Sequence, residues 1–142
     1  MKKRFTKEDI INQEALELDI KETYQRLLKN KRNMKARSEQ QILEDTELGL
    51  VLEHYLMQED TRFKKSTQIN AIDYYHDLID INSGEIHECK VTKSDLGWDS
   101  YYVNKSIKRI TESNWNMSKW MHLAVYDKSC GVYTYKGVKQ IR

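Results

Sequence analysis

The sequence predicts a single α/β domain in which helices flank a mixed β-sheet. The first third of the chain has helical periodicity, with apolar residues recurring three to four positions apart. From about Ala71 onward, short β-rich runs alternate with turn residues. The chain has 142 residues, of which 39% are hydrophobic and 32% charged, and it contains no proline. This size and composition are typical of one ordinary globular domain.

Two helices are predicted before the sheet. The first begins near Thr6, because a threonine hydroxyl can accept a free backbone N–H at a helix start. The second begins at Ser38 and covers residues 42–57. We therefore expect one domain made of a helical N-terminal extension, residues 1–45, and a core, residues 46–142.

The core is predicted to contain a hairpin, a helix and two closing strands. Residues 72–81 and 86–91 form the two strands of the hairpin, which an Asn-Ser-Gly turn connects. Apolar residues at helical spacing mark a helix at 103–110. Residues 122–126 and 132–136 are the closing strands, which completes a mixed sheet.

The overall charge does not favour a class of partner, but its distribution does. The formal net charge is +2, whereas the segment from Arg26 to Arg37 contains six cations and no acid. Such a run either contacts a nucleic-acid backbone or is a solvated helix face. Both readings remain open at the level of sequence.

Cysteine usage and hydropathy predict a reduced, cytoplasmic protein. Cys89 and Cys130 have neither a zinc-binding spacing nor a secretory disulfide pattern. No apolar run approaches the ~20 residues needed to span a bilayer. The N-terminal Met-Lys-Lys-Arg is not followed by the apolar core of a signal peptide.

The hairpin brings three charged residues together. A two-residue turn at residues 83–84 places Asp77 opposite Lys90 and Ile79 opposite Glu88. Opposed residues of an antiparallel pair project to the same face. This register therefore gathers Asp77, Glu88 and Lys90 on one face, and the alternate residues point to the core.

Two carboxylates and a lysine in this arrangement suit a magnesium site. Mg²⁺ prefers oxygen ligands, usually one or two carboxylates with waters and phosphate oxygens. We expect Asp77, Glu88 and the backbone carbonyl of Cys89 to hold Mg²⁺, for which Mn²⁺ would substitute. A bound metal lowers the pKa of water and polarises a phosphate. Lys90 would orient or deprotonate that water.

The pattern Asp77, a turn, then Glu88-x-Lys90 resembles the PD-(D/E)XK nuclease superfamily. The upstream Gly49-x-x-x-Glu53 is similar to the glutamate of the family's first helix, and the later helix–strand order also matches. His76 stands where many members have proline. The resemblance implies a restriction-endonuclease-like core. It also implies that Glu53 joins Asp77, Glu88 and Lys90 in metal binding and catalysis.

The resemblance further implies Mg²⁺-dependent hydrolysis of double-stranded DNA by a homodimer, as in small restriction endonucleases. Small Holliday-junction resolvases share the same layout and are the alternative within this class. A non-catalytic DNA-binding module or a helical interaction protein is the alternative from other classes. The residues expected to contact DNA are basic or aromatic: Lys93, Trp98, Tyr101, Lys105, Lys108, Arg109, Arg26, Lys29, Arg32 and Lys35.

Simpler readings of the acidic residues exist. The charges on the hairpin can form a cross-strand surface ion pair worth ~0.2–1 kcal/mol and nothing more. Asp73 has the same parity as Asp77 and is an alternative ligand. Glu47 is an alternative to Glu53, although it does not share a helix face with Gly49.

Overall fold

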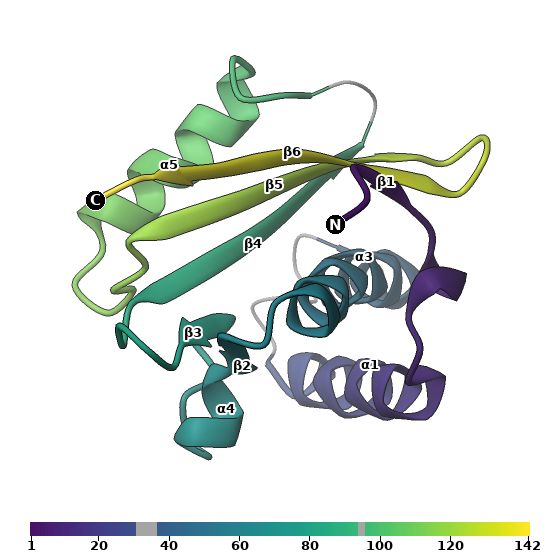
Figure 1. Ribbon diagram of the computed structural model, residues 1–142, viewed down its shortest axis with the longest axis horizontal. Helices are drawn as coiled ribbons and strands as arrows, with labels where there is room; N and C mark the ends of the chain where they lie inside the picture. The colour runs from purple at the N-terminus through teal and green to yellow at the C-terminus, as the bar shows by residue number, and fades with distance from the viewer. Residues whose placement is uncertain (31–36, 94–95) are drawn as a thin grey trace.

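The computed structural model describes residues 1–30, 37–93 and 96–142, and a curled six-stranded sheet forms its centre (Figure 1). Strands β4 and β5 pair in parallel, and the other neighbouring strands pair antiparallel. In sheet order the strands are β1 (Arg4–Phe5), β6 (Val132–Gln140), β5 (Trp120–Asp127), β4 (Ile86–Lys93), β3 (Leu78–Asp80) and β2 (Phe63–Lys65). The mixed sheet is as predicted.

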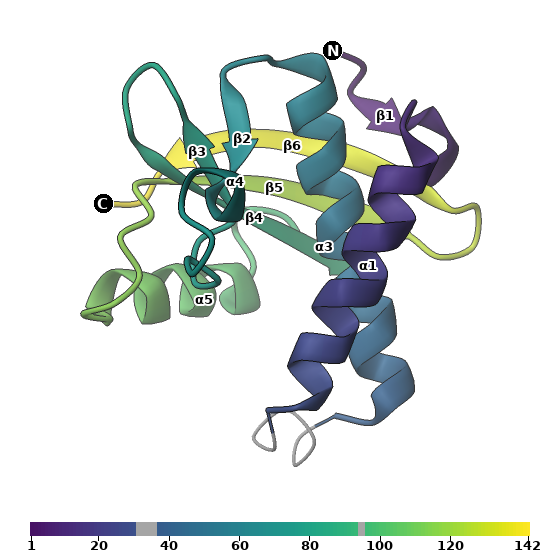
Figure 2. The ribbon, with the colours of Figure 1, turned by 90° about the horizontal axis from the view of Figure 1, so that it is seen from below.

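Helices lie on both faces of this sheet. Helix α3 (Glu39–Glu59) covers one face, α1 (Gln13–Leu28) packs against α3, and α5 (Tyr101–Glu112) lies on the opposite side (Figures 1 and 2). The α5 helix connects β4 to β5, because parallel neighbours need a crossover connection. One short helix, α4 (Ser66–Ile69), follows β2. The predicted α/β class is thus confirmed.

Side-chain caps fix where the long helices begin. The Ser38 hydroxyl accepts the backbone N–H of Gln41 at 3.1 Å, so α3 starts where the sequence predicted. The predicted start at Thr6 leads only into a short 3₁₀ helix, Lys7–Asp9. The first long helix, α1, begins later, where the Asn12 side chain accepts the N–H of Ala15 at 3.0 Å.

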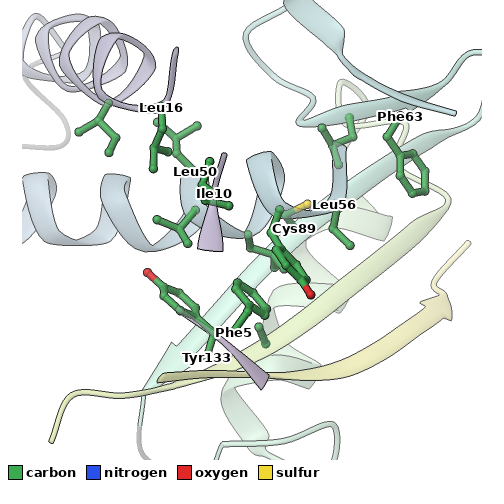
Figure 3. Packing of buried hydrophobic residues seen from close by; sticks show 14 residues of the cluster. Phe5, Ile10, Leu16, Leu50, Leu56, Phe63, Cys89 and Tyr133 are labelled. Atoms are coloured by element: carbon green, nitrogen blue, oxygen red, sulfur yellow. The ribbon is translucent and has the colours of Figure 1, made fainter. Parts of the chain in front are cut away.

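The N-terminal segment belongs to the core and is more than a helical extension. Phe5 is 1% exposed, and its ring stacks on Tyr55 at 3.8 Å and on Tyr133 at 5.0 Å between centroids. Ile10 and Leu16 belong to the same cluster, and Leu16 lies where α1 packs against α3 (Figure 3). The sequence did not predict β1, because a two-residue strand has no detectable periodicity.

The hairpin has a longer turn and a different register from the prediction. Ile79 lies opposite Ile86, not opposite Glu88, which is a shift of two residues. The Asp80 carboxylate accepts the N–H of Asn82 at 2.8 Å, and Gly84, at a φ of 74°, donates to the Asp80 carbonyl at 2.7 Å. These bonds favour a four-residue turn. Because the shift is even, every side chain keeps its predicted face.

The predicted strand at 72–81 is wrong for most of its length. Strand β3 contains only Leu78–Asp80, and Ile72 and Tyr74 are exposed residues of the preceding loop. The sequence also missed β2, whose residues Phe63–Lys65 include two lysines. By contrast β4, α5, β5 and β6 lie at the predicted positions, and each is longer at one or both ends.

Candidate metal and nucleic-acid site

The site forms where β3 separates from β4. The two strands pair at Leu78–His87 and Ile79–Ile86. Beyond these pairs, the side chain of Asp77, and not its backbone, accepts the next hydrogen bond from β4. The backbone N–H of Cys89 donates to Asp77 Oδ2 at 2.8 Å. The carbonyl of Asp77 accepts the N–H of Ser66 at 3.1 Å. Asp77 is thereby held from both sides.

Three carboxylates from different elements converge around this point. Glu53 comes from α3 and is 7% exposed, Asp77 precedes β3, and Glu88 comes from β4. Burial and then the Asp77 charge raise the pKa of Glu53 well above its usual range. The same two causes raise the pKa of Glu88 to about 8. Burial raises the pKa of Asp77 more than hydrogen bonds from the Cys89 N–H and the Glu88 carboxyl lower it.

These shifts mean that the three acids repel one another when all are ionised. Groups of like charge that share a buried site hold protons until another cation neutralises them. A cluster with this property is a candidate functional site on physical grounds.

The segment between α5 and β5 supports Glu88. The Ser118 hydroxyl lies 3.5 Å from Glu88 Oε2, and a hydrogen bond from Asn116 also stabilises the carboxylate. His76 holds this segment next to the Asp77 loop, because its Nε2 accepts the N–H of Met117 at 3.0 Å. The side chain of Glu88 is therefore oriented by a segment distant in sequence.

Lys90 lies on the same face as Glu88 and lines a hollow of about 840 Å³ beside α5. Burial, and then the Arg109 guanidinium, lower the pKa of the Lys90 amine. The carboxylate of Glu88 acts in the opposite direction. An amine with a lowered pKa can accept a proton nearer to neutral pH than an ordinary lysine.

The sequence missed a second lysine at the site. Lys65 Nζ lies 2.5 Å from Asp19 Oδ2 and 3.7 Å from Glu53 Oε1. His54 Nε2 also contacts Asp19 Oδ2, at 2.8 Å. Burial opposes a charge on Lys65, but Glu53 and Asp19 outweigh it and raise the pKa of the amine. Only the three-dimensional pairing of β2 with β3 brings Lys65 here, so no sequence signal indicated it.

A hollow of about 270 Å³ lies between the Lys65–Asp19 pair and the site acids Glu53 and Asp77. It is lined by Asp19, Glu53, Lys65 and Asp77, with Arg26 and Tyr74 among the other residues around it. The Arg26 guanidinium lies 4.3 Å above the Tyr74 ring. One cation of the predicted DNA-binding run is therefore beside the acids.

The residues present fit a magnesium ion by ligand type. Within the described ranges, no group of three or more His, Cys, Asp or Glu side chains is already spaced to enclose a metal. Mg²⁺ needs fewer protein ligands, typically one or two carboxylates. Asp77 and Glu88 are within hydrogen-bonding reach of each other and can supply both. The N–H and C=O of one residue in an extended strand point to the same edge, so the Cys89 carbonyl faces the Asp77 side.

The alternative acids have structural partners. Asp73 Oδ1 contacts His76 Nδ1 at 2.8 Å within its own loop. Glu47 contacts Lys7 Nζ at 2.5 Å. The Asp80 carboxylate is part of the hairpin turn. None of these three acids is among the main causes of the pKa shifts of Glu53, Asp77 and Glu88.

Four of the predicted DNA-contacting residues line the hollow beside α5 together with Lys90: Tyr101, Lys105, Lys108 and Arg109. Two others lie apart. Lys93 Nζ is 3.7 Å from Asp45, and it borders a different, smaller hollow. The Trp98 Nε1–H donates to the Lys136 carbonyl at 2.7 Å, so the polar edge of this indole is already engaged.

The basic run is only partly described. Arg26 is beside the acids, and Lys29 is exposed just after α1. Arg32 and Lys35 lie outside the described residues. Arg37 Nη1 forms an ion pair with Asp45 at 2.9 Å.

Comparisons with known proteins add no family: no family model, curated protein or solved structure matches this chain. Within the part of the chain that the structure describes, no helix is both long and apolar enough to cross a membrane.

Proposed function

We propose that this chain is a Mg²⁺-dependent DNA endonuclease of the PD-(D/E)XK type, acting as a restriction-type enzyme. One observation carries the proposal: Glu53, Asp77 and Glu88 come together from three elements, with Lys90 adjacent on β4. The order of helix α3, the β3–β4 hairpin, helix α5 and strand β5 is also the order that the family resemblance implies.

Each side chain has a chemical role in this proposal. Asp77 and Glu88, with the carbonyl of Cys89 and the nearby Glu53, hold the metal, which activates water and polarises the scissile phosphate when bound. Lys90 accepts a proton from the attacking water, a role that its lowered pKa favours. Asn116 and Ser118 keep Glu88 in position.

Substrate binding is assigned to the hollow beside α5. Lys105, Lys108 and Arg109 offer positive charge to phosphates, and Tyr101 offers an aromatic face. Phosphate contacts of this kind position a nucleic acid and carry no sequence information directly. Lys90 lines the same hollow, and Glu88 lies two residues away on the same face of β4.

Incubation with DNA tests the proposed function directly. Purified protein is mixed with linear, supercoiled and four-way-junction DNA, with Mg²⁺ or with EDTA. We expect cleavage only with Mg²⁺, and cleavage of ordinary duplex rather than only of the junction. Binding without cleavage under both conditions would indicate a DNA-binding module, and the absence of both would exclude the proposal.

A further inference from the structure

The buried lysine of β2 occupies an unusual position between two sets of acids. Its side chain is 16% exposed, and Lys65 Nζ lies 2.5 Å from Asp19 and 3.7 Å from Glu53. The Asp77 charge also acts on this amine. A positive charge is thus already present where the carboxylates of the site repel one another.

Asp19 on α1 is built to retain this lysine. The His54 ring and the Lys65 amine both contact Asp19 Oδ2, and the Thr23 hydroxyl donates to Oδ1 at 3.2 Å. Burial opposes ionisation, but these partners lower the pKa of Asp19 to about 2. Asp19 therefore remains an anion, and it is closer to the amine than Glu53 is.

An ammonium next to Glu53 and Asp77 competes with any other cation at those carboxylates. Two positive charges a few ångströms apart repel strongly in a partly buried site. The amine can relieve this repulsion by moving away from Glu53 while it keeps its closer contact with Asp19.

We propose that Lys65 is a tethered counter-cation: held by Asp19, it neutralises the acidic site in the absence of a divalent ion, and it gives up its contact with Glu53 when the ion binds. This inference rests on the proposed function, because it assumes that Glu53, Asp77 and Glu88 hold a metal. It also gives α1 a role, because this helix supplies Asp19, the anion that holds the Lys65 amine.

Calorimetric titration of Mn²⁺ tests this role without measuring catalysis. Lys65→Met removes the competing charge and keeps an apolar side chain of similar length, so Mn²⁺ should bind at least ~10-fold more tightly. Lys64→Met is the matched control, because Lys64 is the exposed neighbour on the other face of β2. The affinity of Lys64→Met for Mn²⁺ should stay within ~2-fold of that of the parent.

The partner on α1 provides the second half of the test. Asp19→Asn leaves Lys65 with Glu53 and Asp77 alone, so Mn²⁺ should bind less tightly. Asp19→Asn should reduce the affinity for Mn²⁺ by a factor at least ~3-fold larger when Lys65 is present than in the Lys65→Met background. The reason is that residues in contact are energetically coupled. Lys65→Arg keeps the positive charge, so its affinity for Mn²⁺ should be nearly the same as that of the parent.

The outcomes separate this inference from the proposed function. If the parent binds Mn²⁺ and Lys65→Met binds it equally or more weakly, the counter-cation role is overturned while the metal site stands. If neither protein binds Mn²⁺, the metal site and this inference both fail. Should Lys65→Met not fold, as judged by circular dichroism, Asp19→Asn and Lys65→Arg still decide: unchanged affinity in Asp19→Asn contradicts the role.

Discussion

The carboxylate of Asp77 is held by a backbone N–H on one side and faces two other acids on the other. Its bond from Cys89 fixes its position, while burial raises its pKa and makes its ionisation unfavourable. Such an arrangement costs stability when no cation is bound. Sites with perturbed pKa values of this kind are more typical of function than of structural ion pairing.

Replacement of the neighbouring lysine tests the chemistry. Lys90→Ala should abolish DNA cleavage, because the proposed proton acceptor is lost, while folding and DNA binding remain. The measurement compares cleavage rate, circular dichroism and DNA affinity with those of Lys128→Ala, an exposed lysine in the β5–β6 turn. A variant that cuts at more than a few per cent of the parent rate would show that Lys90 is not catalytic.

The pKa of Glu88 makes a prediction about stability and pH. In the folded protein this pKa is about 8, above the ordinary value of 4.5 for a glutamate, so the folded state binds the proton more tightly between these values. The contribution of Glu88 to stability is therefore fully present below pH 4.5 and is lost as the pH rises towards 8. In EDTA, the free energy of unfolding should fall with pH by at most about 1.4 kcal/mol per pH unit for this proton.

Chemical denaturation from pH 5 to 9 measures this slope. Glu88→Gln should flatten it, because the amide does not titrate. Glu85→Gln is the control, since Lys119 lowers the pKa of Glu85 and this group stays ionised across the range. Equal slopes in the parent and Glu88→Gln would contradict the buried acid cluster.

Among the strands, the sequence predicted correctly which side chains share a face of the sheet, but it did not predict the register in which β3 and β4 pair. The alternation in Ile86–Lys93 placed Glu88 and Lys90 together correctly, whatever the register. It did not specify the register, because Asp80 is compatible with turns of different length. Here its side chain accepts the N–H groups of Asn82 and Ser83 and lengthens the turn. The prediction that Asp77, Glu88 and Lys90 share a face still holds, because a shift of two residues keeps each side chain on the same face of the sheet.

Short elements account for what the sequence missed at the site. Strand β2 has three residues, and its position beside β3 depends on long-range packing of Phe63. Lys65 was therefore not identified, nor was its partner Asp19 on α1. Helix α5 was predicted easily, because its apolar residues recur at helical spacing and its charges lie on other faces.

The basic surface of α5 makes a prediction about DNA binding. Replacement of Lys105, Lys108 and Arg109 with glutamine on the Lys90→Ala background should make the salt dependence of DNA affinity shallower. Each lost phosphate contact reduces the slope by about 0.9, so a change of about one to three units is expected. Binding isotherms at several salt concentrations measure it.

A control with the same loss of charge makes this test specific. Lys3, Lys128 and Lys136 are exposed and do not line the hollow beside α5. Replacing these three with glutamine should change the slope by less than half as much. Equal effects would mean that DNA responds only to net charge, and no effect of the α5 variant would assign binding to the Arg26–Arg37 run.

At the scale of the whole molecule, the N-terminal segment is part of the sheet and the core. The sequence correctly indicated helices here, but the aromatic stack of Phe5 with Tyr55 and Tyr133 joins residues that are far apart in sequence. Such contacts leave no local pattern. The extension therefore supports the fold through β1 and reaches the site through α1.

A core substitution tests this integration. Phe5→Ala should lower the free energy of unfolding by about 3–5 kcal/mol, because it removes a fully buried ring from between two others. Ile11→Ala is the control, since Ile11 is 85% exposed. Denaturant unfolding measures both, and a loss below about 1 kcal/mol for Phe5→Ala would show that the segment folds apart from the core.

Calorimetric titration of Mg²⁺ and Mn²⁺ into the parent protein and single acid variants tests whether Asp77 and Glu88 hold a metal ion. Asp77→Asn and Glu88→Gln should each weaken metal binding by at least ~10-fold, because a neutral amide replaces a charged oxygen ligand. Asp73→Asn and Asp80→Asn should bind normally, since those carboxylates belong to the His76 loop and the hairpin turn. Normal metal binding by Asp77→Asn would contradict the account and assign the metal to other acids.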